Sequence, residues 1–305
     1  MSDRLMLLDT ASLYFRAFYG VPDKVKADDG TSVNAARGLL DIIAKLVTTY
    51  EPTRLVACWD DDWRPAWRVD LLPTYKAHRV VQAVEGEPDI EEVPPALTAQ
   101  IPLIREALDT LGIAVVGAPA HEADDVIGTL ATHADVPVDI VTGDRDLFQL
   151  VDDARGIRVI YTARGMSNLD IIDDASVQAR YGVRPDQYAD FAALRGDPSD
   201  GLPGVPGIGE KSAAALLAAC GDLAGIRAAA ADGTAGTPTQ RAKVLAAGDY
   251  LDVAPTVVRV ARDLDLSPAD DRILVDDARA TAATALAERW NLGTPMARAI
   301  TALRG

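Results

Sequence analysis

The stretch HEADDVIGTLATHADVPVDIVTGDRDLFQLV, residues 121–151, decides the fold of this chain because it interleaves acidic residues with two apolar segments. Residues 122–133 have the apolar spacing of a helix with acids in its first turn. Residues 138–146 are an apolar run that ends in two acids, which predicts a buried strand. The acids that flank these segments are Glu122, Asp124, Asp125, Asp144 and Asp146. Burying like charges together costs several kcal/mol per ion, so a positive partner is expected among them.

The same alternation of strands and helices extends outward from this stretch. The predicted strands are residues 5–9, 54–61, 113–117 and 156–162, and the predicted helices are residues 32–50, with Ser32 as the N-cap, and 96–112, with Gly112 as the stop. This alternation indicates an α/β fold with a mostly parallel sheet. From about residue 176 the strand signals fade and Ala-rich helical segments dominate.

The topology of such a sheet brings distant acids together. The acids at predicted strand ends are Asp9, Asp60 or Asp61, and Asp144. Ligands of open α/β sheets bind at the carboxyl ends of the strands, and Asp197 and Asp200 add carboxylates in the turn GDPSD. Oxygen ligands without nearby Cys or paired His favour magnesium or manganese over zinc. A single Asp at a strand end is more commonly a turn former or a helix cap, so spacing alone leaves both interpretations open.

Composition sets further bounds. The chain has 305 residues, 49% hydrophobic and 25% charged, which is typical of a soluble globular protein with one or two domains. No apolar run approaches the roughly 20 residues that span a bilayer, and the N-terminus lacks a signal-peptide pattern. Only two cysteines occur, which indicates a reducing, cytoplasmic location. The net charge of −16 disfavours nucleic acid, unless bound cations reverse the local sign.

Five motifs together resemble the 5′-nuclease family, the flap endonucleases and the 5′→3′ exonuclease domains of bacterial DNA polymerase I. They are LLDTASLYFRAFYG, YKAHR, EADDVIGTLA, TGDRDLFQLV and LRGDPSDGLPGVPGIGEKSA. The similarity runs from residue 5 to about 250, with no polymerase domain following. It implies a PIN-like, mostly parallel central sheet flanked by helices, with a helical arch and a helix–three-turn–helix DNA-binding region. The implied division is a nuclease domain at 1–175 with the arch at about 62–95, a DNA-binding region at 176–264, and C-terminal helices at 265–305 that pack back on the nuclease domain.

The resemblance also assigns metal ligands. The matching positions are Asp9, Asp60, Glu122, Asp124, Asp125, Asp144, Asp146, Asp197 and Asp200. Between Asp60 and Asp61 the register is ambiguous. Position on the strand favours Asp60, whereas the spacing to the following WR and YK favours Asp61, and Asp62 is expected to be solvated. The resemblance implies two or more Mg²⁺ or Mn²⁺ ions, which would stabilise the attacking and leaving oxygens of phosphodiester hydrolysis.

Basic and aromatic residues take substrate roles in the same comparison. Lys76 matches the family's catalytic lysine on the arch, where a cation would stabilise charge on the scissile phosphate. Arg79 would bind a phosphate, and Tyr75 would stack on a nucleobase. Arg16 matches a substrate-contacting position. Taken alone, YKAHR would be an exposed basic turn and Arg16 a surface salt-bridge partner.

The segment GVPGIGEKSAAALL matches the helix–three-turn–helix element, which grips duplex DNA by its backbone without reading bases. Gly204, Gly207 and Gly209 allow close approach to a phosphate, the following helix offers free N–H groups, and Lys211 adds a charge. In the family, carbonyls of this loop also hold K⁺. Taken alone, the segment would be an interdomain turn.

The chain is thus expected to be a metal-dependent 5′-nuclease, a flap endonuclease and 5′→3′ exonuclease acting in DNA replication and repair. Branched or 5′-ended DNA is the expected partner of a cytoplasmic, nucleoid-associated monomer without membrane contact. The first alternative is a branched-DNA-binding protein with weak or lost catalysis, and the second is a phosphatase or RNA nuclease on the same sheet. The acidic segment 82–95 either faces solvent or restricts which substrates thread through.

Overall fold

The central sheet has six strands in the order β5-β2-β1-β6-β7-β8 in the computed structural model, which describes residues 3–82 and 89–304. The strands are β1 (Leu5–Asp9), β2 (Arg54–Cys58), β5 (Ala114–Val116), β6 (Val138–Thr142), β7 (Ile157–Tyr161) and β8 (Asp170–Ile172). All neighbouring pairs are parallel except β7 and β8, which are antiparallel. The chain therefore has the mostly parallel sheet that its alternating pattern predicts.

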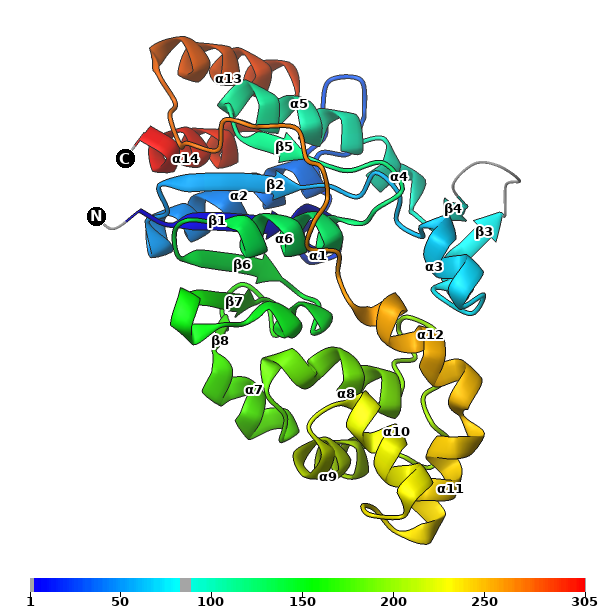
Figure 1. The fold of residues 1–305 in the computed structure, drawn as a ribbon. Helices are drawn as coiled ribbons and strands as arrows, with labels where there is room; N and C mark the ends of the chain where they lie inside the picture. Colours follow the sequence, from blue (N-terminus) through cyan, green and yellow to red (C-terminus); the bar gives the residue numbers. More distant parts are fainter. Residues whose placement is uncertain (1–2, 83–88, 305) are drawn as a thin grey trace.

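Helices cover both faces of this sheet (Figure 1). Along β1, Leu7 belongs to the hydrophobic core on one face, whereas Met6 and Leu8 belong to the core on the other. Successive strand side chains point to opposite faces, so a strand is apolar throughout only where both faces are covered. The first core is covered by α6 (Ala123–His133), and the second by α1 (Thr10–Gly20), α2 (Asn34–Tyr50) and α5 (Ile101–Leu111).

A helical region follows β8 and forms the lower half of Figure 1. Its helices are α7 (Asp174–Tyr181), α8 (Tyr188–Arg195), α9 (Glu210–Cys220), α10 (Leu223–Asp232), α11 (Pro238–Ala246) and α12 (Gly248–Val258), with a short 3₁₀ turn at Pro185–Gln187. Two further 3₁₀ turns, Asp146–Leu150 and Asp153–Arg155, lie earlier in the chain, between β6 and β7. Within the described residues, no single helix has the length and apolar character to cross a membrane, although the bent pair of α9 and α10 passes on those two criteria when both are counted together.

The chain then returns to the sheet. Figure 1 shows the segment after α12 climbing along the molecule to α13 (Asp277–Arg289) and α14 (Gly293–Arg304). Helix α14 packs against α2, where Arg298 pairs with Asp41 at 2.9 Å and Arg37 donates to the carbonyl of Asn291 at 2.6 Å. Helix α13 packs against α5. The C-terminal helices thus lie on the sheet half of the molecule.

The segment at 62–95 is less helical than an arch of helices. It contains α3 (Ala66–Leu71), the 3₁₀ turn Ala77–Arg79, β3 (Val80–Gln82), β4 (Ile90–Glu91) and α4 (Pro95–Thr98). Strands β3 and β4 pair in an antiparallel ribbon. Part of the acidic segment predicted at 82–95, residues 83–88, lies outside the described residues. Hereafter the arch segment means residues 62–82 and 89–95.

Two helix starts differ from the sequence prediction. The predicted helix at 32–50 begins at Asn34, and the Ser32 hydroxyl donates to Asp23 at 2.9 Å instead of capping the helix. The predicted helix at 96–112 is divided into α4 and α5. Pro102 lies in the first turn of α5, where its missing N–H costs nothing. The predicted stop is correct, because Gly112 ends α5 with a positive φ of 72°.

Candidate active site

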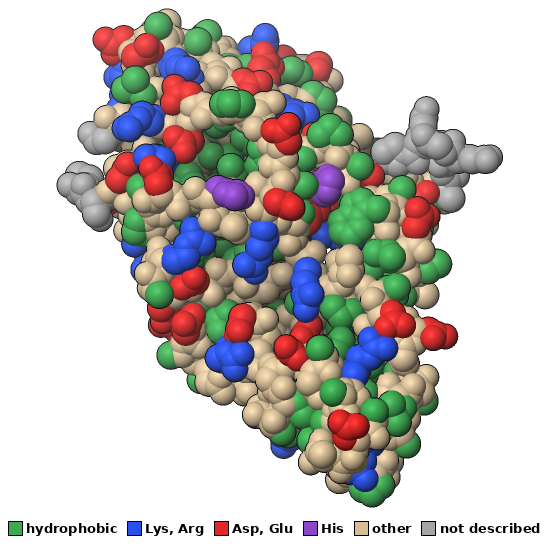
Figure 2. Space-filling model, viewed as in Figure 1, with side chains coloured by type: hydrophobic (Ala, Val, Ile, Leu, Met, Phe, Trp, Pro, Cys, Tyr) green, Lys and Arg blue, Asp and Glu red, His purple; other side chains and the backbone are tan. Residues whose placement is uncertain are grey.

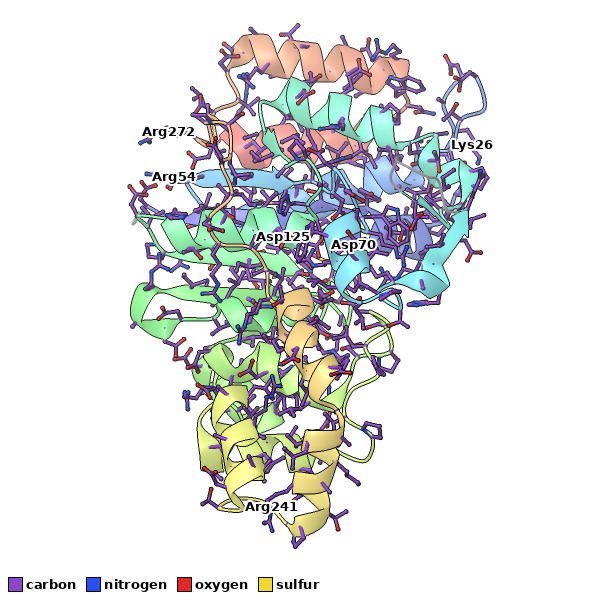
Figure 3. All side chains as sticks on the ribbon, turned by 45° about the vertical axis from the view of Figure 1, so that its right-hand side comes forward. Lys26, Arg54, Asp70, Asp125, Arg241 and Arg272 are labelled. Carbon is purple, nitrogen blue, oxygen red and sulfur yellow. The ribbon has the colours of Figure 1, made fainter. Side chains whose placement is uncertain are left out.

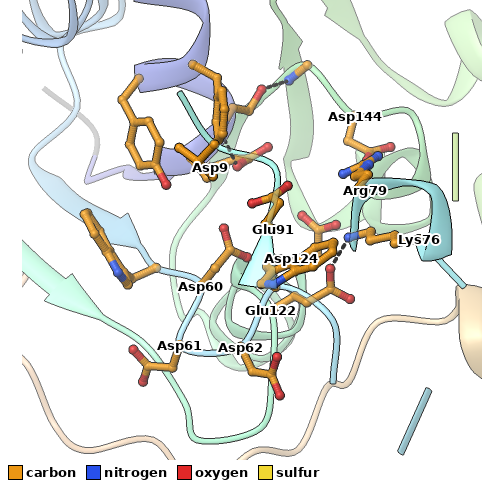
Figure 4. A pocket seen from close by; sticks show the side chains of 18 of the residues that line it. Asp9, Asp60, Asp61, Asp62, Lys76, Arg79, Glu91, Glu122, Asp124 and Asp144 are labelled. Carbon is orange, nitrogen blue, oxygen red and sulfur yellow. Dashed lines mark hydrogen bonds and ion pairs between the residues drawn. The ribbon is translucent and has the colours of Figure 1, made fainter. Parts of the chain in front are cut away.

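A cleft of about 600 Å³ lies at the carboxyl edge of the sheet, beside the arch segment. Its acidic lining residues are Asp9, Asp60, Asp61, Asp62, Glu91, Glu122, Asp124 and Asp144, and its basic lining residues are Lys76, Arg79 and Arg145. Figure 4 shows the acids converging from the ends of β1 and β2, from the start of α6 and from the loop after β6. Parallel strands end at one edge of a sheet, which is why acids so distant in sequence meet here.

Asp9 is the last residue of β1 and the N-cap of α1. Its Oδ1 accepts from the N–H of Ser12 at 3.2 Å, and its Oδ2 accepts from the hydroxyl of Thr142 at 2.6 Å. Burial, together with the nearby charge of Asp60, raises the pKa of Asp9 to about 7. The side chain is thus held by neutral donors in a place where its own charge is poorly compensated.

The three acids after β2, Asp60, Asp61 and Asp62, lie in different environments. Asp60 Oδ1 accepts from the N–H of Ala123 at the start of α6 at 2.8 Å, and burial raises the pKa of Asp60 to about 6. Asp61 is exposed, with its carboxyl group against Gly117. This geometry favours Asp60 as the inward-facing acid. The expectation that Asp62 is solvated is wrong, because Asp62 is buried and accepts from the N–H of Arg64 at 3.1 Å.

Asp124 and Asp144 face each other across the cleft from α6 and from the loop after β6. Burial, followed by the charges of Asp144 and Asp9, raises the pKa of Asp124 well above its ordinary value. Asp144 Oδ1 accepts from the N–H of Asp146 at 2.8 Å. Two carboxylates that repel each other in this way are stabilised either by a proton on one of them or by a cation bound between them.

A second acid group, Asp146, Asp197 and Asp200, adjoins Asp144. Asp146 is buried, and among the described residues its Oδ1 has no hydrogen-bond partner. Burial, with the charges of Asp144 and Asp200, raises the pKa of Asp146 well above its ordinary value. Burial also raises the pKa of Asp200 to about 6, although Lys76 opposes the shift.

Asp197 differs from its neighbours because it already has cations. It lies 3.2 Å from Arg145 and 3.0 Å from Arg195, and it accepts from the N–H of Ser199 at 3.0 Å. Asp197 is therefore the member of the second group whose charge is compensated by the protein's own arginines.

Lys76 and Arg79 form the basic side of the cleft. The Nζ of Lys76 pairs with Oε1 of Glu122 (Figure 4), and Lys76 holds a positive φ of 46°. Burial alone would lower the pKa of Lys76, but Glu122 and further acids raise it well above its ordinary value. Arg79 is partly exposed and lies 3.5 Å from Asp200. Both cations thus lie beside the acids of the cleft.

Tyr75 does not have the predicted role. Its side chain is 4% exposed, and its hydroxyl donates to Oε2 of Glu122 at 2.6 Å. A ring buried in this way has no free face for a nucleobase, so the stacking prediction is corrected. The motif YKAHR predicted a turn beside Tyr75, but it did not predict the direction in which the Tyr75 side chain points.

Asp125 is likewise absent from the cleft lining. It is fully buried, and Arg68 binds both of its oxygens, at 2.9 and 2.7 Å. The N–H of Ala261 adds a bond of 2.8 Å to Oδ1. In Figure 3, Asp125 lies in the interior where α6 meets α3. The predicted ligand role is therefore not supported, because helical spacing placed Asp125 near Glu122 but on a face that turns toward α3.

Arg68 is the buried cation beside the acids that the sequence interpretation missed. The sequence required positive partners among the acids, and Arg68 and Lys76 are such partners, contributed by the arch segment. The one available signal was the basic residue in WRVD, which lies between the acidic strand end and YKAHR. Nothing in the local pattern distinguished it from a surface arginine.

The predicted DNA-contacting residues have mixed environments. Arg16 is close to Gly143 at the cleft, and among the described residues its buried Nε has no partner. Gly209 is the N-cap of α9, and no described neighbouring atom lies within 4 Å of the position that a Cβ would take. Lys211 is exposed in the first turn of α9. These three residues remain accessible to a phosphate.

Gly204 and Gly207 instead serve the loop itself. A Cβ at Gly204 would meet the backbone of Arg195 at 2.6 Å, and the Gly204 N–H donates to the hydroxyl of Tyr250 at 3.2 Å. The carbonyl of Gly207 accepts from Lys243 at 3.2 Å. Both have positive φ, which favours glycine in the turn, and at Gly204 the close approach of the Arg195 backbone also requires it. Figure 2 shows Lys and Arg side chains gathered across the middle of the molecule, between the sheet and helical halves.

The donor set fits divalent cations. All cleft acids offer hard oxygen ligands, the unpartnered Oδ1 of Asp146 is a buried acceptor, and four of the acids have raised pKa values without a compensating cation at hydrogen-bond distance in the described structure. Among the described residues, no group of three or more acidic, His or Cys side chains already stands in position to hold one ion. Binding would therefore require side chains to move, above all Lys76, which now pairs with the Glu122 oxygen that faces the cleft.

The fold and the acidic cleft define a nuclease with a resolvase-like α/β half and a helical half. The family model for the 5′-3′ exonuclease N-terminal resolvase-like domain matches residues 4–182, and the model for the 5′-3′ exonuclease C-terminal SAM fold matches residues 183–280. The chain belongs to the 5′-3′ exonuclease family.

Relatives of full length carry the same description. A 5′-3′ exonuclease of Streptomyces coelicolor is 60% identical over 299 residues, covering 98% of this chain and 99% of that protein. A 5′-3′ exonuclease of Mycobacterium tuberculosis is 49% identical over 308 residues, covering 98% and 97%. DNA polymerase I of Mycobacterium bovis is 43% identical over 223 residues, which are 72% of this chain but 23% of the polymerase. These matches confirm the predicted family and the predicted class of enzyme.

Solved structures share the fold. The T5 D15 protein co-crystallised with metal ions has a TM-score of 0.65 at 18% identity, covering 99% of this chain and 100% of that one. The catalytic core of Rad2 in complex with DNA substrate has a TM-score of 0.56 at 19% identity, covering 99% and 91%. The predicted fold class is therefore confirmed.

Proposed function

We propose that this 5′-3′ exonuclease family member is a divalent-metal-dependent nuclease that hydrolyses branched and 5′-ended DNA, as a flap endonuclease and as a 5′→3′ exonuclease, in DNA replication and repair. The observation that carries the proposal is the cleft itself, where buried and half-buried acids from four parts of the sheet edge line the same cavity as Lys76 and Arg79. The names of the similar proteins support it: relatives called 5′-3′ exonuclease, and neighbours crystallised with metal ions or with DNA substrate.

Two acid groups would hold the metal ions. Asp9, Asp60, Glu122, Asp124 and Asp144 line the first position, and Asp146, Asp197 and Asp200 adjoin Asp144 at the second. Their oxygen ligands suit Mg²⁺ or Mn²⁺. Bound there, two such ions would stabilise the attacking and leaving oxygens of the phosphodiester. Carbonyls of the loop at 204–209 are candidates for K⁺.

The chain's own cations would act on the substrate. Lys76 and Arg79 line the cleft, where they would bind the scissile phosphate and stabilise the charge that develops on it. Lys76 must leave Glu122 to do so, because the two now form an ion pair. Ser12 and Thr142 would hold Asp9 in place during the reaction through their existing hydrogen bonds.

The helical region would grip the duplex beside the cleft. The open N-terminal end of α9 at Gly209, the exposed Lys211, and Arg16 next to the cleft would contact phosphates. We assign the nuclease domain to 1–175, the DNA-binding region to 176–264 and the packed-back helices to 265–305. A monomer in the cytoplasm, associated with the nucleoid through DNA, suits this arrangement.

The test is cleavage of a 5′-flap duplex and of a duplex with a free 5′ end, each in Mn²⁺ with and without excess EDTA. Cleavage that requires Mn²⁺ supports the proposal. Lys76→Ala should lower the single-turnover rate about 10²- to 10³-fold, whereas Lys24→Ala, at an exposed lysine outside the cleft lining, should leave it unchanged.

Other outcomes would point to the alternatives. DNA binding without metal-dependent cleavage would favour a branched-DNA-binding protein. Faster cleavage of RNA or of a small phosphate ester than of DNA would favour a different phosphoesterase.

A further inference from the structure

Arg68 joins three parts of the molecule that are distant in sequence. It lies on α3 and is 2% exposed. Its Nη1 donates to Oε2 of Glu122 at 2.5 Å, and its Nη1 and Nη2 donate to the two oxygens of Asp125 at 2.9 and 2.7 Å. Its Nε donates to the carbonyl of Val257 in the last turn of α12 at 3.0 Å. One guanidinium thus links the arch segment, the start of α6 and the end of the DNA-binding region.

These contacts fix the direction of the Glu122 carboxylate. Its Oε2 is held by Arg68 and by the hydroxyl of Tyr75 at 2.6 Å, both on the buried side. Its Oε1 pairs with Lys76, which lines the cleft. The buried oxygen is therefore tied to rigid neighbours, and the other oxygen is presented to the cleft (Figure 4).

Only a guanidinium can make this set of contacts. Glu122 is the N-cap of α6 and Asp125 its third residue, and the carboxylates of both contact the same guanidinium. The planar fork of arginine binds one of them with two parallel bonds and still reaches the other and a carbonyl, whereas a lysine ammonium is a single point charge. Asp125, with both oxygens occupied, anchors the fork itself.

We propose that Arg68 is a positioning residue: it holds Glu122 so that Oε1 meets the divalent ion entering the cleft, with Asp125 as its anchor. The inference deepens the proposed function and rests on it, because it presumes that the cleft binds metal. Residues that orient metal ligands in this way typically change metal affinity 10- to 100-fold when they are replaced. A residue that only supported the fold would change stability and leave the affinity of the folded protein as it was.

The experiment measures Mn²⁺ binding to the full chain by isothermal titration calorimetry and by the loss of the free-Mn²⁺ electron paramagnetic resonance signal, without DNA. Arg68→Gln should raise the Kd for Mn²⁺ about 10-fold or more. Arg68→Lys, which keeps the charge, should raise it less. Asp125→Asn should lower stability and raise the Kd less than Arg68→Gln does. Circular dichroism confirms folding, and if Arg68→Gln does not fold, Arg68→Lys against Asp125→Asn carries the test.

Arg4→Gln is the matched control, because Arg4 pairs with the buried Asp139 at 2.7 Å, and neither residue lines the cleft. Its Kd should equal that of the wild type. Wild-type Mn²⁺ affinity in folded Arg68→Gln and Arg68→Lys would overturn the inference, as would a Kd raised equally by Asp125→Asn and Arg68→Gln. No Mn²⁺ binding by the wild-type chain would instead refute the proposed metal site, which keeps the two failures distinct.

Discussion

The acids at the sheet edge, Asp9 and Asp60, and the acids next to the arch segment, Glu122 and Asp125, are stabilised in different ways. Asp9 and Asp60 accept from neutral N–H and hydroxyl donors, and their pKa values rise to about 7 and about 6. Glu122 and Asp125 contact Arg68 at 2.5 to 2.9 Å. Among the described residues, the first pair has no cation from the protein at hydrogen-bond distance, whereas the second pair is held in place by Arg68, which leaves only Oε1 of Glu122 to face Lys76 and the cleft. Partner chemistry thus separates the carboxylates that lack a cation from those that the protein's own cation holds in position.

The largest expected effect is on catalysis at the sheet edge. Asp124→Asn should lower the single-turnover rate on a 5′-flap substrate about 10³-fold, because a bound-ion site contributes several kcal/mol of charge stabilisation and each 1.4 kcal/mol is tenfold in rate. Asp135→Asn is the matched control, since Asp135 is exposed and pairs with Arg54 at 3.1 Å outside the cleft. A rate within tenfold of wild type for Asp124→Asn would remove Asp124 from the metal site.

The second effect is a pH dependence of stability in the metal-free protein. Because folding raises the pKa of Asp9 from an ordinary 3.8 to about 7, the native state binds more protons than the unfolded state between about pH 4 and pH 7. The free energy of unfolding should therefore fall as the pH rises through that window, by up to about 4 kcal/mol for Asp9 alone.

Urea unfolding in EDTA at pH 5 and pH 8 measures the larger part of this fall, about 3 kcal/mol for Asp9, and Asp9→Asn should reduce it. Saturating Mg²⁺ should diminish it further, because the ion replaces the proton as the partner of these carboxyls. Stability in EDTA that is constant or rises with pH would show that the acids are compensated by something other than protons or metal.

The same contrast explains how far the sequence could predict the site. Asp9 and Asp144 follow apolar runs, and parallel topology alone brings strand ends to one edge, so they were placed from the sequence. Asp60 and Asp61 both follow β2, and what distinguishes them is the N–H of Ala123, 63 residues away. Such a choice depends on tertiary packing and has no local signal.

For Asp125 and Tyr75 the sequence predicted the position of the residue but not the direction of its side chain. Helical spacing correctly put Asp125 near Glu122, and motif spacing correctly put Tyr75 beside Lys76. The directions of both side chains, however, depend on Arg68 and Glu122, which come from other segments. The fold class was predictable because apolar periodicity reports which faces are covered, whereas these two roles required knowing what covers them.

The third effect concerns the stability of the pair beside the arch segment. Asp125→Asn should lower the free energy of unfolding by about 3 kcal/mol, because it leaves the buried guanidinium of Arg68 short of one charge partner. Asp124→Asn should not destabilise the metal-free protein, since it removes a carboxylate crowded by Asp144 and Asp9. Urea unfolding in EDTA compares the two variants directly, and equal losses would mean that the two groups of acids do not differ as described.

The smallest expected effect tests whether Tyr75 supports Glu122 through its hydroxyl or stacks on a nucleobase. Tyr75→Phe keeps the buried ring and removes the hydroxyl that donates to Glu122 at 2.6 Å, so it should cost about 1 to 2 kcal/mol of stability, because the acceptor is charged. Affinity for a 5′-flap duplex in Ca²⁺, measured by fluorescence anisotropy, should stay at the wild-type value. Tyr75→Leu sharpens the test, because loss of a stacking ring would cost about 1 to 3 kcal/mol of DNA affinity. Weaker DNA binding by Tyr75→Leu, with its fold intact, would mean that the ring leaves its buried site to meet the substrate and that the arch segment rearranges around Glu122.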